Sequence, residues 1–498
     1  MNITELLGLD AAPVSATPLA PGAAPLKNLE IAGITADSRE VRAGFLFAAL
    51  KGARTDGRRF AAEAAAKGAA AILTDDPAAL DLDAERRGRI AIVADPNPQR
   101  LLALAASRFY PVRPKTLAAV TGTNGKTSVA HFAREIWQAL GHKSASLGTL
   151  GCIVGGERHA GALTTPDPVA LHRTLGELAM RGVDCVAIEA SSHGLAQFRL
   201  DGLSFAAAAF TNLTRDHLDY HGDMGTYRAA KDRLFTTLLA PGGTAVLNAD
   251  SAEYARLFAL VRGRGHNVIS YGSNGSADLR LVSRMPRRDG QRVGLSLYGE
   301  AHDIELKLIG DFQAQNVLAA LGLTLAAGSE LSAAVAALPG LTTVPGRMQF
   351  VGEINRAAVF VDYAHTPDAL ATVLRAARPH AARRLVVAFG AGGDRDAGKR
   401  PLMGQVAAEN ADLVYVTDDN PRTEVAAAIR RAILVAAPGA IEIGDRREAI
   451  GAAIAALEAG DVLVIAGKGH ESGQIVGRET LPFDDVVVAR EAIGERGP

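Results

Sequence analysis

The segment Val120-Thr-Gly-Thr-Asn-Gly-Lys-Thr-Ser128 constrains the fold of this chain more than any other feature of its sequence. It lies between an apolar run, residues 117–120, and a stretch with helical periodicity, and its two glycines allow a tight turn. A strand, a glycine-containing loop and a helix in this order present backbone N–H groups and a helix N-terminus to phosphate. The pattern therefore predicts an α/β fold with a phosphate-binding loop at the end of a parallel strand.

Two side chains of this loop have the chemistry that nucleotide binding needs. Lys126 would place an ammonium group on the β- and γ-phosphates of ATP, and the Thr127 hydroxyl would ligate the Mg²⁺ ion that bridges them. A strict P-loop has glycine where Val120 stands, so the loop is a variant; a chance match would lack the flanking strand and helix. We predict ATP and Mg²⁺ as cofactors, with an ATP-binding loop of Gly122, Thr123, Asn124, Gly125, Lys126 and Thr127.

The length of the chain predicts several domains. Its 498 residues exceed one ordinary core, and domains of roughly 100 to 200 residues suggest about three. A proline-punctuated segment, residues 110–115, precedes the region of the phosphate loop. We predict an N-terminal α/β domain over residues 1–111, a central P-loop-type parallel-sheet domain over 112–343 and a C-terminal Rossmann-like domain over 344–498. The apolar runs expected as strands of the last two domains are residues 183–188, 206–210, 244–247, 357–362, 385–389, 413–417 and 462–466.

Composition and charge argue against several classes of protein. No apolar run approaches the roughly 20 residues of a membrane-spanning helix, and the N-terminus does not resemble a signal peptide, so we expect a cytoplasmic protein. The formal net charge is −1, which gives no electrostatic footprint of the kind that nucleic-acid binders show. The two cysteines, Cys152 and Cys185, lack metal-ligand spacing, so we expect core thiols rather than a disulfide framework or a structural zinc site.

Polar loops follow two further apolar runs of the central region. Glu189-Ala-Ser-Ser-His-Gly194 places a carboxylate where open α/β sheets bind ligands, so Glu189 is a candidate magnesium ligand. The loop from Phe210 to His221 crowds two histidines and two aspartates together. A plain polar loop is equally consistent with that composition. A zinc site of His217 and His221 is a further alternative, although oxygen-preferring magnesium suits the neighbouring acids better.

Charged residues elsewhere allow more than one interpretation. By sequence alone, Lys231 lies on a charge-laced helical stretch and is interpreted as a surface lysine. In the C-terminal region, Gly392-Gly-Asp-Arg-Asp396 and Asp419-Asn-Pro-Arg422 place arginines on turns after apolar runs. Such arginines are usually solvated, but guanidinium groups also recognise carboxylates through paired hydrogen bonds. Two arginines at strand ends favour a substrate that carries a carboxylate.

Taken together, these motifs resemble the signature set of one family. Thr121-Gly-Thr-Asn-Gly-Lys-Thr127, Glu189-Ala-Ser-Ser-His193, Thr211-Asn-Leu-Thr-Arg-Asp-His217 and Asp362-Tyr-Ala-His-Thr-Pro367 occur in the order typical of Mur ligases. The resemblance covers residues 38–471 and includes the three-domain division. It implies an ATP-dependent, amide-bond-forming ligase of cytoplasmic peptidoglycan synthesis, and hence a role in cell wall biogenesis, cell shape and cell division. It also implies small-molecule substrates, no nucleic-acid or membrane partner, and a monomer.

The resemblance further implies which amino acid is added. Asp419-Asn-Pro-Arg422 resembles the motif with which diaminopimelate-adding Mur ligases bind the free end of that amino acid, and lysine-adding relatives lack this arginine. The implied reaction joins meso-diaminopimelate to the D-glutamyl carboxylate of UDP-N-acetylmuramoyl-L-alanyl-D-glutamate through an acyl phosphate. The implied diaminopimelate pocket comprises Arg395, Asp419, Asn420, Pro421, Arg422, Gly467 and Glu471.

Further site residues are carried over from the family. Lys231 is implied to be carbamylated and, with Lys126 and His217, to be catalytic. Leu163 is apolar where some relatives have an amide side chain, so only its backbone is expected to contribute. The implied metal ligands are Thr127, Glu189, His217 and the carbamate of Lys231, and Asn316, Arg347 and Asp362 are implied to join the ATP site. The implied UDP-substrate-binding residues are Ala36, Ser38, Ala53, Arg54, Thr55, Leu163, Thr164, Thr165, Ser191, Gln197 and Arg199.

Two other functions stay open at this point. A folylpolyglutamate-synthase-like ligase would use the same chemistry, but the Asp419-Asn-Pro-Arg422 motif and the N-terminal UDP-type domain argue against it. A P-loop nucleotide switch would need Lys126 and Thr127 but no arginines that recognise a carboxylate. The sequence does not indicate which residue accepts the proton of the attacking amine.

Overall fold

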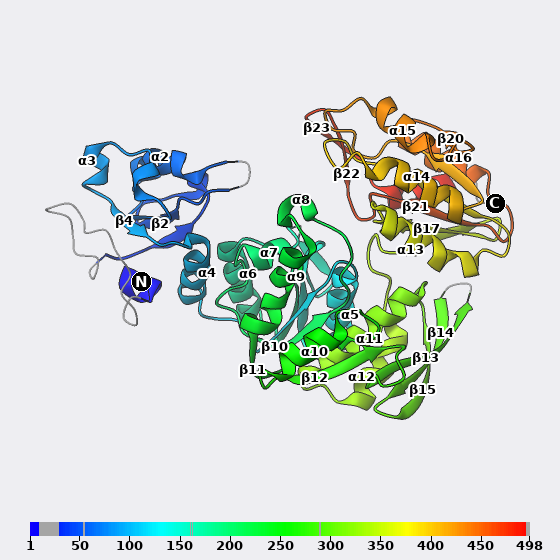
Figure 1. Ribbon diagram of the computed structural model, residues 1–498, viewed down its shortest axis with the longest axis horizontal. Helices are drawn as coiled ribbons and strands as arrows, with labels where there is room; N and C mark the ends of the chain where they lie inside the picture. The colour runs from blue at the N-terminus through cyan, green and yellow to red at the C-terminus, as the bar shows by residue number, and fades with distance from the viewer. Residues whose placement is uncertain (9–28, 53–54, 160, 162, 288–289, 495–498) are drawn as a thin grey trace. The chain divides into compact units, whose positions relative to one another are not determined.

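The computed structural model describes residues 1–8, 29–52, 55–159, 161, 163–287 and 290–494, and Figure 1 colours them from the N- to the C-terminus. The chain folds into two compact units. The first consists of residues 1–126, 133–269 and 322–330, and the second of residues 127–132, 270–321 and 331–498. Among the helices of these described residues, none is long and apolar enough to cross a membrane.

The first unit begins with a parallel sheet in the order β1-β2-β3-β4. Successive side chains of a strand point to opposite faces, so Leu46 and Leu73 pack with α1 and α4, whereas Phe47 and Ile72 pack with α2. This arrangement confirms the predicted N-terminal α/β region. Its elements are α1 (Ile3–Leu7), β1 (Gly33–Thr35), η3 (Ser38–Glu40), β2 (Phe45–Ala48), η4 (Gly57–Phe60), α2 (Ala61–Ala66), β3 (Ala71–Thr74), η5 (Pro77–Ala79), α3 (Ala84–Arg87), β4 (Ala91–Ala94) and α4 (Pro98–Phe109).

The phosphate-loop region of the first unit is built on strands in the order β11-β10-β5-β9-β6-β7-β8. The strands from β11 to β6 pair in parallel, as predicted, whereas β6, β7 and β8 pair antiparallel. This antiparallel edge was not predicted, because β8 is fully exposed and carries no apolar run. The elements are β5 (Thr116–Thr121), α5 (Lys126–Ala139), β6 (Ser144–Gly148), β7 (Gly151–Val154), β8 (Glu157–His159), α6 (Pro168–Met180), β9 (Cys185–Glu189), α7 (Ser192–Ala196), β10 (Phe205–Phe210), α8 (Leu218–His221), α9 (Met224–Arg233), η6 (Leu234–Leu238), β11 (Leu239–Asn248), α10 (Tyr254–Arg262) and β12 (Asn267–Gly272).

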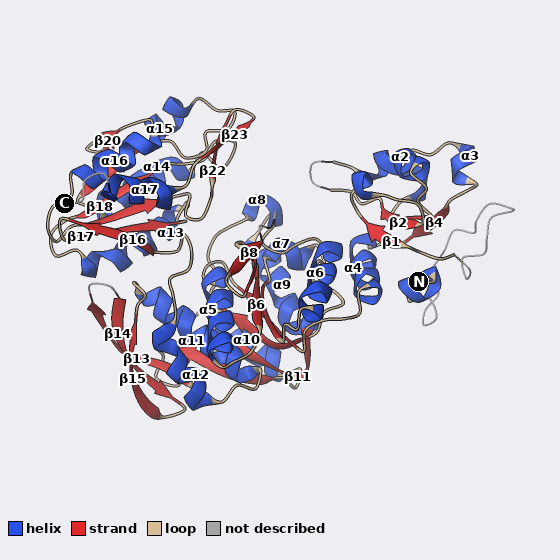
Figure 2. Cartoon of the chain, turned by 180° about the vertical axis from the view of Figure 1, so that it is seen from behind, coloured by secondary structure: helices blue, strands red, loops and turns tan. Residues whose placement is uncertain are grey.

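The second unit contains an antiparallel meander, β13-β14-β15, and a six-stranded sheet in the order β16-β17-β21-β18-β19-β20. Every pair of the six-stranded sheet is parallel except β16 with β17. One face of this sheet packs on α13, α14 and α15 and the other on α16 and α17, so helices cover both sides of the strands in Figure 2. The predicted Rossmann-like arrangement is confirmed, with an antiparallel edge strand added.

The predicted C-terminal runs coincide with strands of that sheet. Residues 357–362, 385–389 and 462–466 are β17, β18 and β21. Strand β19 covers residues 413–416, so it ends one residue before the end of the predicted run 413–417. The elements of the second unit are β13 (Leu279–Arg287), β14 (Gly290–Leu297), β15 (Glu300–Leu306), α11 (Asp311–Ala326), α12 (Leu331–Ala337), η7 (Leu338–Gly340), β16 (Gln349–Ile354), β17 (Ala357–Asp362), α13 (Pro367–Ala377), η8 (Arg378–His380), β18 (Leu385–Phe389), α14 (Lys399–Asn410), β19 (Leu413–Val416), α15 (Ala426–Leu434), β20 (Ile441–Glu442), α16 (Arg446–Ala455), β21 (Val462–Ala466), β22 (Gly473–Val476), β23 (Glu479–Pro482) and α17 (Asp485–Gly494). Helix α11 continues into residues that belong to the first unit.

Candidate active site

Three neighbouring parallel strands of the first unit end beside one another. In the order β10-β5-β9, Thr121 is paired with Phe210, and Val120 is paired with Glu189. The loops that follow these strands carry the phosphate loop and the polar motifs that begin at Glu189 and Thr211. Because the carboxyl ends of parallel strands meet at one edge of a sheet, where open α/β sheets bind ligands, the three motifs form one site.

The phosphate loop is braced by the loop after β10. The Thr123 N–H donates to Asn212 O over 2.9 Å. Gly122 has a φ of +150°, and a Cβ there would overlap with the Thr211 hydroxyl, so this position requires glycine. The Lys126 ammonium donates to Gly122 O over 2.9 Å and to Thr123 O over 2.7 Å. The loop therefore holds a cation within its own turn.

Helix α5 begins directly after this loop. Gly125 is its N-cap residue and has a φ of +89°, which a side chain would strain. The Asn124 N–H donates to Asn212 Oδ1 over 2.9 Å. Thr127 follows in the first helical turn with its side chain buried. The start of a helix carries unpaired N–H groups and a positive partial charge, so this end of α5 favours an anion.

Lys231 lies against the phosphate loop rather than on the surface, so its interpretation as a surface lysine was wrong. Its side chain is 2% exposed, and its Nζ donates to Gly122 O over 2.8 Å and lies 4.3 Å from the centroid of the Tyr227 ring. Burial, followed by the nearby charge of Lys126, lowers the pKa of Lys231 well below its ordinary value. The buried side chains Tyr227, Ala230 and Lys231 have helical spacing, which was the one available signal.

Aromatic rings and imidazoles gather beside Lys231. His193 lies 4.8 Å from His217, 5.4 Å from His221 and 4.2 Å from Tyr220 between ring centroids. Burial, with the neighbouring imidazoles second, lowers the pKa of His193 to about 4, and burial also lowers the pKa values of His217 and His221. These imidazoles are therefore neutral at neutral pH. Within the described part of the chain, no group of three or more His, Cys, Asp or Glu side chains is placed to hold a metal ion.

Glu189 is a buried carboxylate at the carboxyl end of β9. Its Oε1 accepts from Thr149 N over 2.8 Å and its Oε2 accepts from Thr149 Oγ1 over 3.1 Å. A Cβ at Gly148 would overlap with Oε1, so glycine there makes room for the carboxylate. Thr149 Oγ1 lies 3.1 Å from Thr164 Oγ1, and Thr165 Oγ1 donates to Glu189 O over 2.7 Å. The two threonines predicted to hold the nucleotide sugar therefore lie directly beside Glu189.

The other predicted nucleotide-sugar residues of the central region join the same network. Thr165 Oγ1 lies 3.0 Å from Ser191 Oγ. Arg199 donates to Thr165 O over 2.7 Å and also to Gln197 Oε1, and Gln197 donates to the Tyr220 hydroxyl over 3.0 Å. Leu163 is 46% exposed. The structure thus joins Thr165, Ser191, Gln197 and Arg199 in one network.

Of the predicted residues in the N-terminal region, Ala36, Ser38 and Thr55 are described, and they follow strands β1 and β2. Ala36 and Thr55 are exposed, whereas Ser38 is buried at the start of η3 with its Oγ 3.4 Å from Glu63 Oε2. The predictions for Ala53 and Arg54 fall outside the described residues. Among the hydrogen bonds of the described residues, none connects this group to the threonines beside Glu189. That these residues and the threonines beside Glu189 bind one nucleotide-linked substrate stays a prediction.

In the second unit, the loops after β19 and β21 form a hydrogen-bonded group. Asn420 Nδ2 donates to Glu471 Oε2 over 2.9 Å, and Lys468 Nζ donates to Asn420 Oδ1 over 3.0 Å. Gly467 has a φ of +117°, and a Cβ there would lie 2.6 Å from Asp419 Oδ2, so glycine is required at this position too. Both strands pair in register with β18, which brings their carboxyl ends to one edge of the sheet. Four residues of the predicted diaminopimelate pocket therefore come together.

Arg422 connects this group to the loop after β18. Its guanidinium donates to Gly393 O over 2.7 Å, and its backbone forms a bridge with Val476 of β22. It has a φ of +51°, a conformation that a non-glycine residue adopts only at a conformational cost. A Cβ at Gly393 would overlap with Pro421 O, so the two loops approach closely. Arg395 follows on the same loop and is exposed, which leaves both predicted arginines at one edge of the sheet.

The remaining predicted ATP-site residues meet at the end of β17. Asp362 is buried and accepts from Met348 N and Ala364 N, each over 2.7 Å. Burial raises the pKa of Asp362, and the charge of Arg347 opposes this shift. The Arg347 guanidinium lies 4.7 Å from the centroid of the Tyr363 ring. Gln313 links the set, because it accepts from Asn316 Nδ2 over 3.0 Å and donates to Arg347 O over 3.4 Å.

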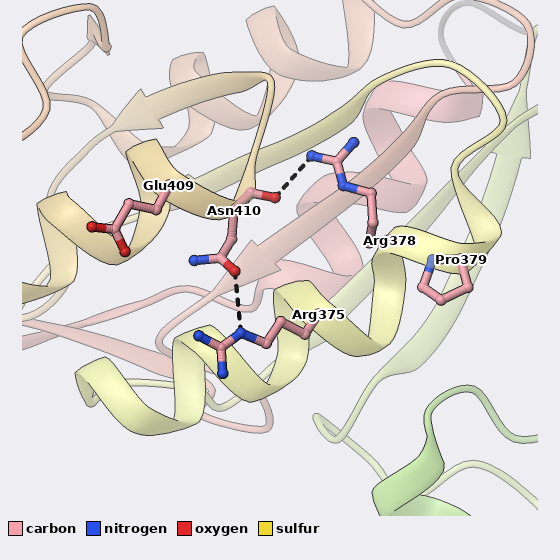
Figure 3. Close-up of a pocket in the computed structure, with 5 residues that line it drawn as sticks. All are labelled: Arg375, Arg378, Pro379, Glu409 and Asn410. Carbon is pink, nitrogen blue, oxygen red and sulfur yellow. Dashed lines mark hydrogen bonds between the residues drawn. The ribbon is translucent and has the colours of Figure 1, made fainter.

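A pocket of about 320 Å³ lies away from these groups, near the ends of α13 and α14 (Figure 3). Arg378 donates to Asn410 O over 2.8 Å, and Arg375 donates to Asn410 Oδ1 over 3.3 Å. The pocket is lined by Arg375, Arg378, Pro379, Glu409 and Asn410, and none of these is a predicted site residue. Because its arginines already bond to the protein, this pocket does not compete as the candidate site.

Sequence reasoning missed several polar residues of these sites. Thr149 braces Glu189, Lys468 holds Asn420, and Lys399 Nζ donates to His365 O over 2.9 Å. Burial lowers the pKa of Lys399. Lys468 directly follows Gly467, a predicted site residue, and this adjacency was a usable signal. Thr149 and Lys399 lie outside every motif, so the sequence offered no comparable signal for them.

Comparison with family models finds three matches along the chain. Residues 30–121 match the Mur ligase family, catalytic domain; residues 120–324 match the Mur ligase middle domain; and residues 346–469 match the Mur ligase, glutamate ligase domain. Together these matches span the N-terminal sheet, the phosphate-loop region and the C-terminal sheet.

Comparison with individual proteins finds similarity over the whole chain. The UDP-N-acetylmuramoyl-L-alanyl-D-glutamate--2,6-diaminopimelate ligase of Bradyrhizobium diazoefficiens is 51% identical over 100% of both chains. The protein of that name from Caulobacter vibrioides is 52% identical over 93% of this chain and 95% of its own. A solved structure of a UDP-N-acetylmuramoyl-L-alanyl-D-glutamate--2,6-diaminopimelate ligase is 33% identical, with a TM-score of 0.71 over 100% of this chain and 99% of that chain.

Proposed function

Because the chain belongs to the Mur ligase family, we propose that it joins meso-diaminopimelate to the D-glutamyl carboxylate of UDP-N-acetylmuramoyl-L-alanyl-D-glutamate, with conversion of ATP to ADP and phosphate. The product is the UDP-linked tripeptide of peptidoglycan synthesis. Relatives about half identical over nearly the full chain carry the name of this activity. The observation that carries the proposal is the group of Asn420, Arg422 and Glu471, which offers a guanidinium and a carboxylate to an amino acid bearing both charges.

The phosphate loop is proposed to bind ATP with Mg²⁺. The Thr127 hydroxyl and the Glu189 carboxylate are oxygen donors of the kind that Mg²⁺ prefers, and glycine at position 148 makes room for that carboxylate, so these residues fit the ion. When bound, Mg²⁺ supplies charge neutralisation on the phosphates. Lys126 adds a second positive charge, and the loop N–H groups orient the phosphates; Asn316, Arg347 and Asp362 are proposed to complete the ATP site.

Lys231 is proposed to carry a carbamate. Carbamylation requires a neutral amine, and burial lowers the pKa of Lys231 well below its ordinary value, which favours the neutral form. The product would be an anion beside Lys126, which would replace a like-charge contact by an attractive one. With His217, the carbamate of Lys231 is proposed to complete the metal environment, and both residues are proposed to be catalytic.

The proposed reaction has two steps, and the chain's residues have distinct tasks in each. A carboxylate resists attack by an amine because it lacks a leaving group, so its oxygen first takes the γ-phosphoryl group of ATP to give an acyl phosphate. Lys126 and the loop N–H groups stabilise the charge on the phosphates during that transfer. The neutral amine then attacks the acyl carbon, phosphate leaves with the bonding electron pair, and the nitrogen releases one proton. The orienting residues for the nucleotide sugar are proposed to be Ala36, Ser38, Ala53, Arg54, Thr55, Leu163, Thr164, Thr165, Ser191, Gln197 and Arg199.

The amino acid is proposed to bind at the edge of the C-terminal sheet. Arg422 and Arg395 would take the carboxylate at its free end, and Glu471 would take the ammonium group. Asp419, Pro421 and Gly467 shape the loops that present these side chains. Asn420 holds the Glu471 carboxylate in place through a 2.9 Å hydrogen bond. This division of charge favours an amino acid whose free end is a zwitterion.

We also propose the domain limits 1–111, 112–343 and 344–498, a monomeric state and a cytoplasmic location. The domain limits are supported by the family-model matches at residues 30–121, 120–324 and 346–469. The location is supported by the proposed use of ATP and a nucleotide-linked substrate. The monomeric state rests on the sequence-based expectation alone, and size-exclusion chromatography with light scattering would test it.

The proposed function is tested by phosphate release from the purified full-length chain. The reaction contains ATP, Mg²⁺ and UDP-N-acetylmuramoyl-L-alanyl-D-glutamate, with meso-diaminopimelate, L-lysine or no amino acid, and mass spectrometry identifies the product. We expect release and a tripeptide product with diaminopimelate. Release that needs no amino acid would indicate a nucleotide switch, and a preference for lysine would contradict the role of Arg422. Lys126→Met serves as the matched control, because it should abolish release with every amino acid.

A further inference from the structure

Lys468 is a fully buried cation inside the proposed amino-acid site. Its side chain is 0% exposed and follows Gly467 directly after β21. Its Nζ lies 3.0 Å from Asn420 Oδ1 and 3.3 Å from Glu471 Oε2. A buried ammonium persists only where it is paired and hydrogen-bonded, and here an amide oxygen and a carboxylate oxygen fill that role. Lys468 therefore belongs to the electrostatics of this site rather than to the solvent-exposed surface.

Lys468 helps to set the orientation of the Asn420 amide. An amide side chain can be turned over, which exchanges its oxygen with its nitrogen. Oδ1 of Asn420 accepts from Lys468 Nζ and also from the Ile475 N–H over 2.9 Å. Both partners are hydrogen-bond donors, so the oxygen must face them. Nδ2 then faces Glu471 Oε2, to which it donates over 2.9 Å.

The same contacts orient the carboxylate of Glu471. Its Oε2 receives hydrogen bonds from Asn420 Nδ2 and Lys468 Nζ. These two hydrogen bonds hold Oε2 against the protein. Because the carboxylate is planar and rigid, they also fix the position of Oε1. The side chain of Glu471 is 34% exposed, whereas that of Lys468 is 0% exposed, so the carboxylate and not the ammonium can meet a ligand. Lys468 acts on a bound amino acid through Glu471 and Asn420.

Charge balance gives Lys468 a second effect. Its positive charge compensates the negative charge of Glu471, so the region does not act as a strong anionic trap for any ammonium group. An amino acid with both an ammonium and a carboxylate at its free end can still use Arg422. An amino acid whose free end bears only an ammonium group gains less binding free energy, because the charge-compensated carboxylate of Glu471 attracts it weakly.

We propose that Lys468 is a positioning residue that orients Asn420 and Glu471 and sets the preference for an amino acid with a zwitterionic free end. The inference rests on the proposed function and extends it to a residue that does not itself meet the substrate. It predicts that removal of this charge weakens the use of diaminopimelate relative to that of L-lysine.

The test compares the full-length chain with Lys468→Met, Lys468→Gln and Lys468→Arg. Initial rates of phosphate release give kcat and KM for diaminopimelate, L-lysine and ATP. With Met and Gln, we expect the KM for diaminopimelate to rise about tenfold and the diaminopimelate-to-lysine ratio of kcat/KM to fall about tenfold, while the KM for ATP stays within about twofold. Arginine retains the charge, so the diaminopimelate-to-lysine ratio of kcat/KM for Lys468→Arg should stay within about threefold of the wild-type ratio. Lys307→Met removes an exposed lysine elsewhere in the same unit and should change none of these values.

The outcomes separate this inference from the proposed function. If the wild-type chain releases no phosphate in response to diaminopimelate, the proposed function itself is overturned. If the wild type is active and both neutral variants keep the wild-type ratio, the inference on Lys468 is overturned alone. A fall in the ratio for Lys468→Arg as large as that for Lys468→Met would overturn the charge argument. Should the Met variant fail to fold, the Gln variant decides, because glutamine retains hydrogen-bonding groups.

Discussion

The buried ion pair between Arg446 and Asp485 allows a quantitative test of how the second unit is held together. Both side chains are fully buried, and the guanidinium donates to the two carboxylate oxygens over 2.8 Å and 2.7 Å. Loss of one partner of such a pair leaves a buried charge uncompensated, which costs about 3–5 kcal/mol. We expect Asp485→Asn to lower the free energy of unfolding by about 3 kcal/mol. This value is near the lower limit because asparagine keeps the shape of the side chain and one acceptor.

Removal of both charges should cost less than removal of one. Arg446→Met with Asp485→Leu leaves no buried charge, and such exchanges are often close to neutral. Arg446 also donates to Ala466 O over 3.0 Å and to Asp418 O over 3.4 Å, so methionine deprives these carbonyl groups of a donor. The loss of these two hydrogen bonds, one well formed and one long, should lower the free energy of unfolding by about 1–3 kcal/mol in total. The double variant should therefore be more stable than Asp485→Asn or equal to it.

Hydrogen exchange measured by mass spectrometry can detect this difference locally. The single tryptophan, Trp137, lies in α5, so its fluorescence does not report directly on α16 and α17. A local loss of about 3 kcal/mol should accelerate exchange of peptides from α16 and α17 by about 150-fold, with peptides from β3 as the internal control. Unchanged exchange in Asp485→Asn, or faster exchange in the double variant than in the single one, would refute the reasoning.

Three predictions concern other positions. Burial lowers the pKa of His172 to about 4 from 6.5, so between these pH values the unfolded chain binds more protons than the folded chain. The free energy of unfolding should therefore be highest above pH 6.5 and fall toward pH 4. From pH 6.5 to 5 this loss is about 2 kcal/mol, and His172→Gln should remove it from the pH dependence of urea unfolding. Gly122→Ala should raise the KM for ATP about tenfold or more through its backbone strain and its overlap with Thr211, whereas Gly340→Ala, with open space around it, should not. Arg422→Lys should raise the KM for diaminopimelate about tenfold with that for ATP unchanged, and equal changes in both would contradict its role.

The central strands of the six-stranded sheet could be predicted because they are buried on two faces. Residues 385–389 and 462–466 are continuous apolar runs, and each coincides with a strand whose side chains are all buried. The phosphate loop could be predicted for a different reason, since its glycines have backbone angles that side chains disfavour. Strands β8 and β23 are fully exposed and β22 is mostly half-buried, so these strands lack such a signal, and their pairing partners alone determine them.

Side-chain partners distant in sequence could not be predicted in the same way. Arg446 and Asp485 are 39 residues apart, and either one alone resembles a solvent-exposed charge. Lys231 was interpreted as a surface residue because its helix is rich in charge, although the side of the helix that meets the phosphate loop is buried. Polar residues that pack against polar loops leave no hydrophobic pattern, so burial of this kind follows from the tertiary structure.

The degree of charge compensation distinguishes the roles of three buried cations. Arg446 has a fully buried carboxylate in bidentate contact, which is the arrangement expected of a structural pair. Lys468 shares a partly exposed carboxylate with the proposed ligand site, so its charge can act on what binds there. Lys231 instead donates to a backbone carbonyl and has a second lysine as its strongest charged neighbour. A fold that only needed stability would gain from an apolar side chain at this position, which supports the proposal that Lys231 takes part in chemistry at the phosphate loop.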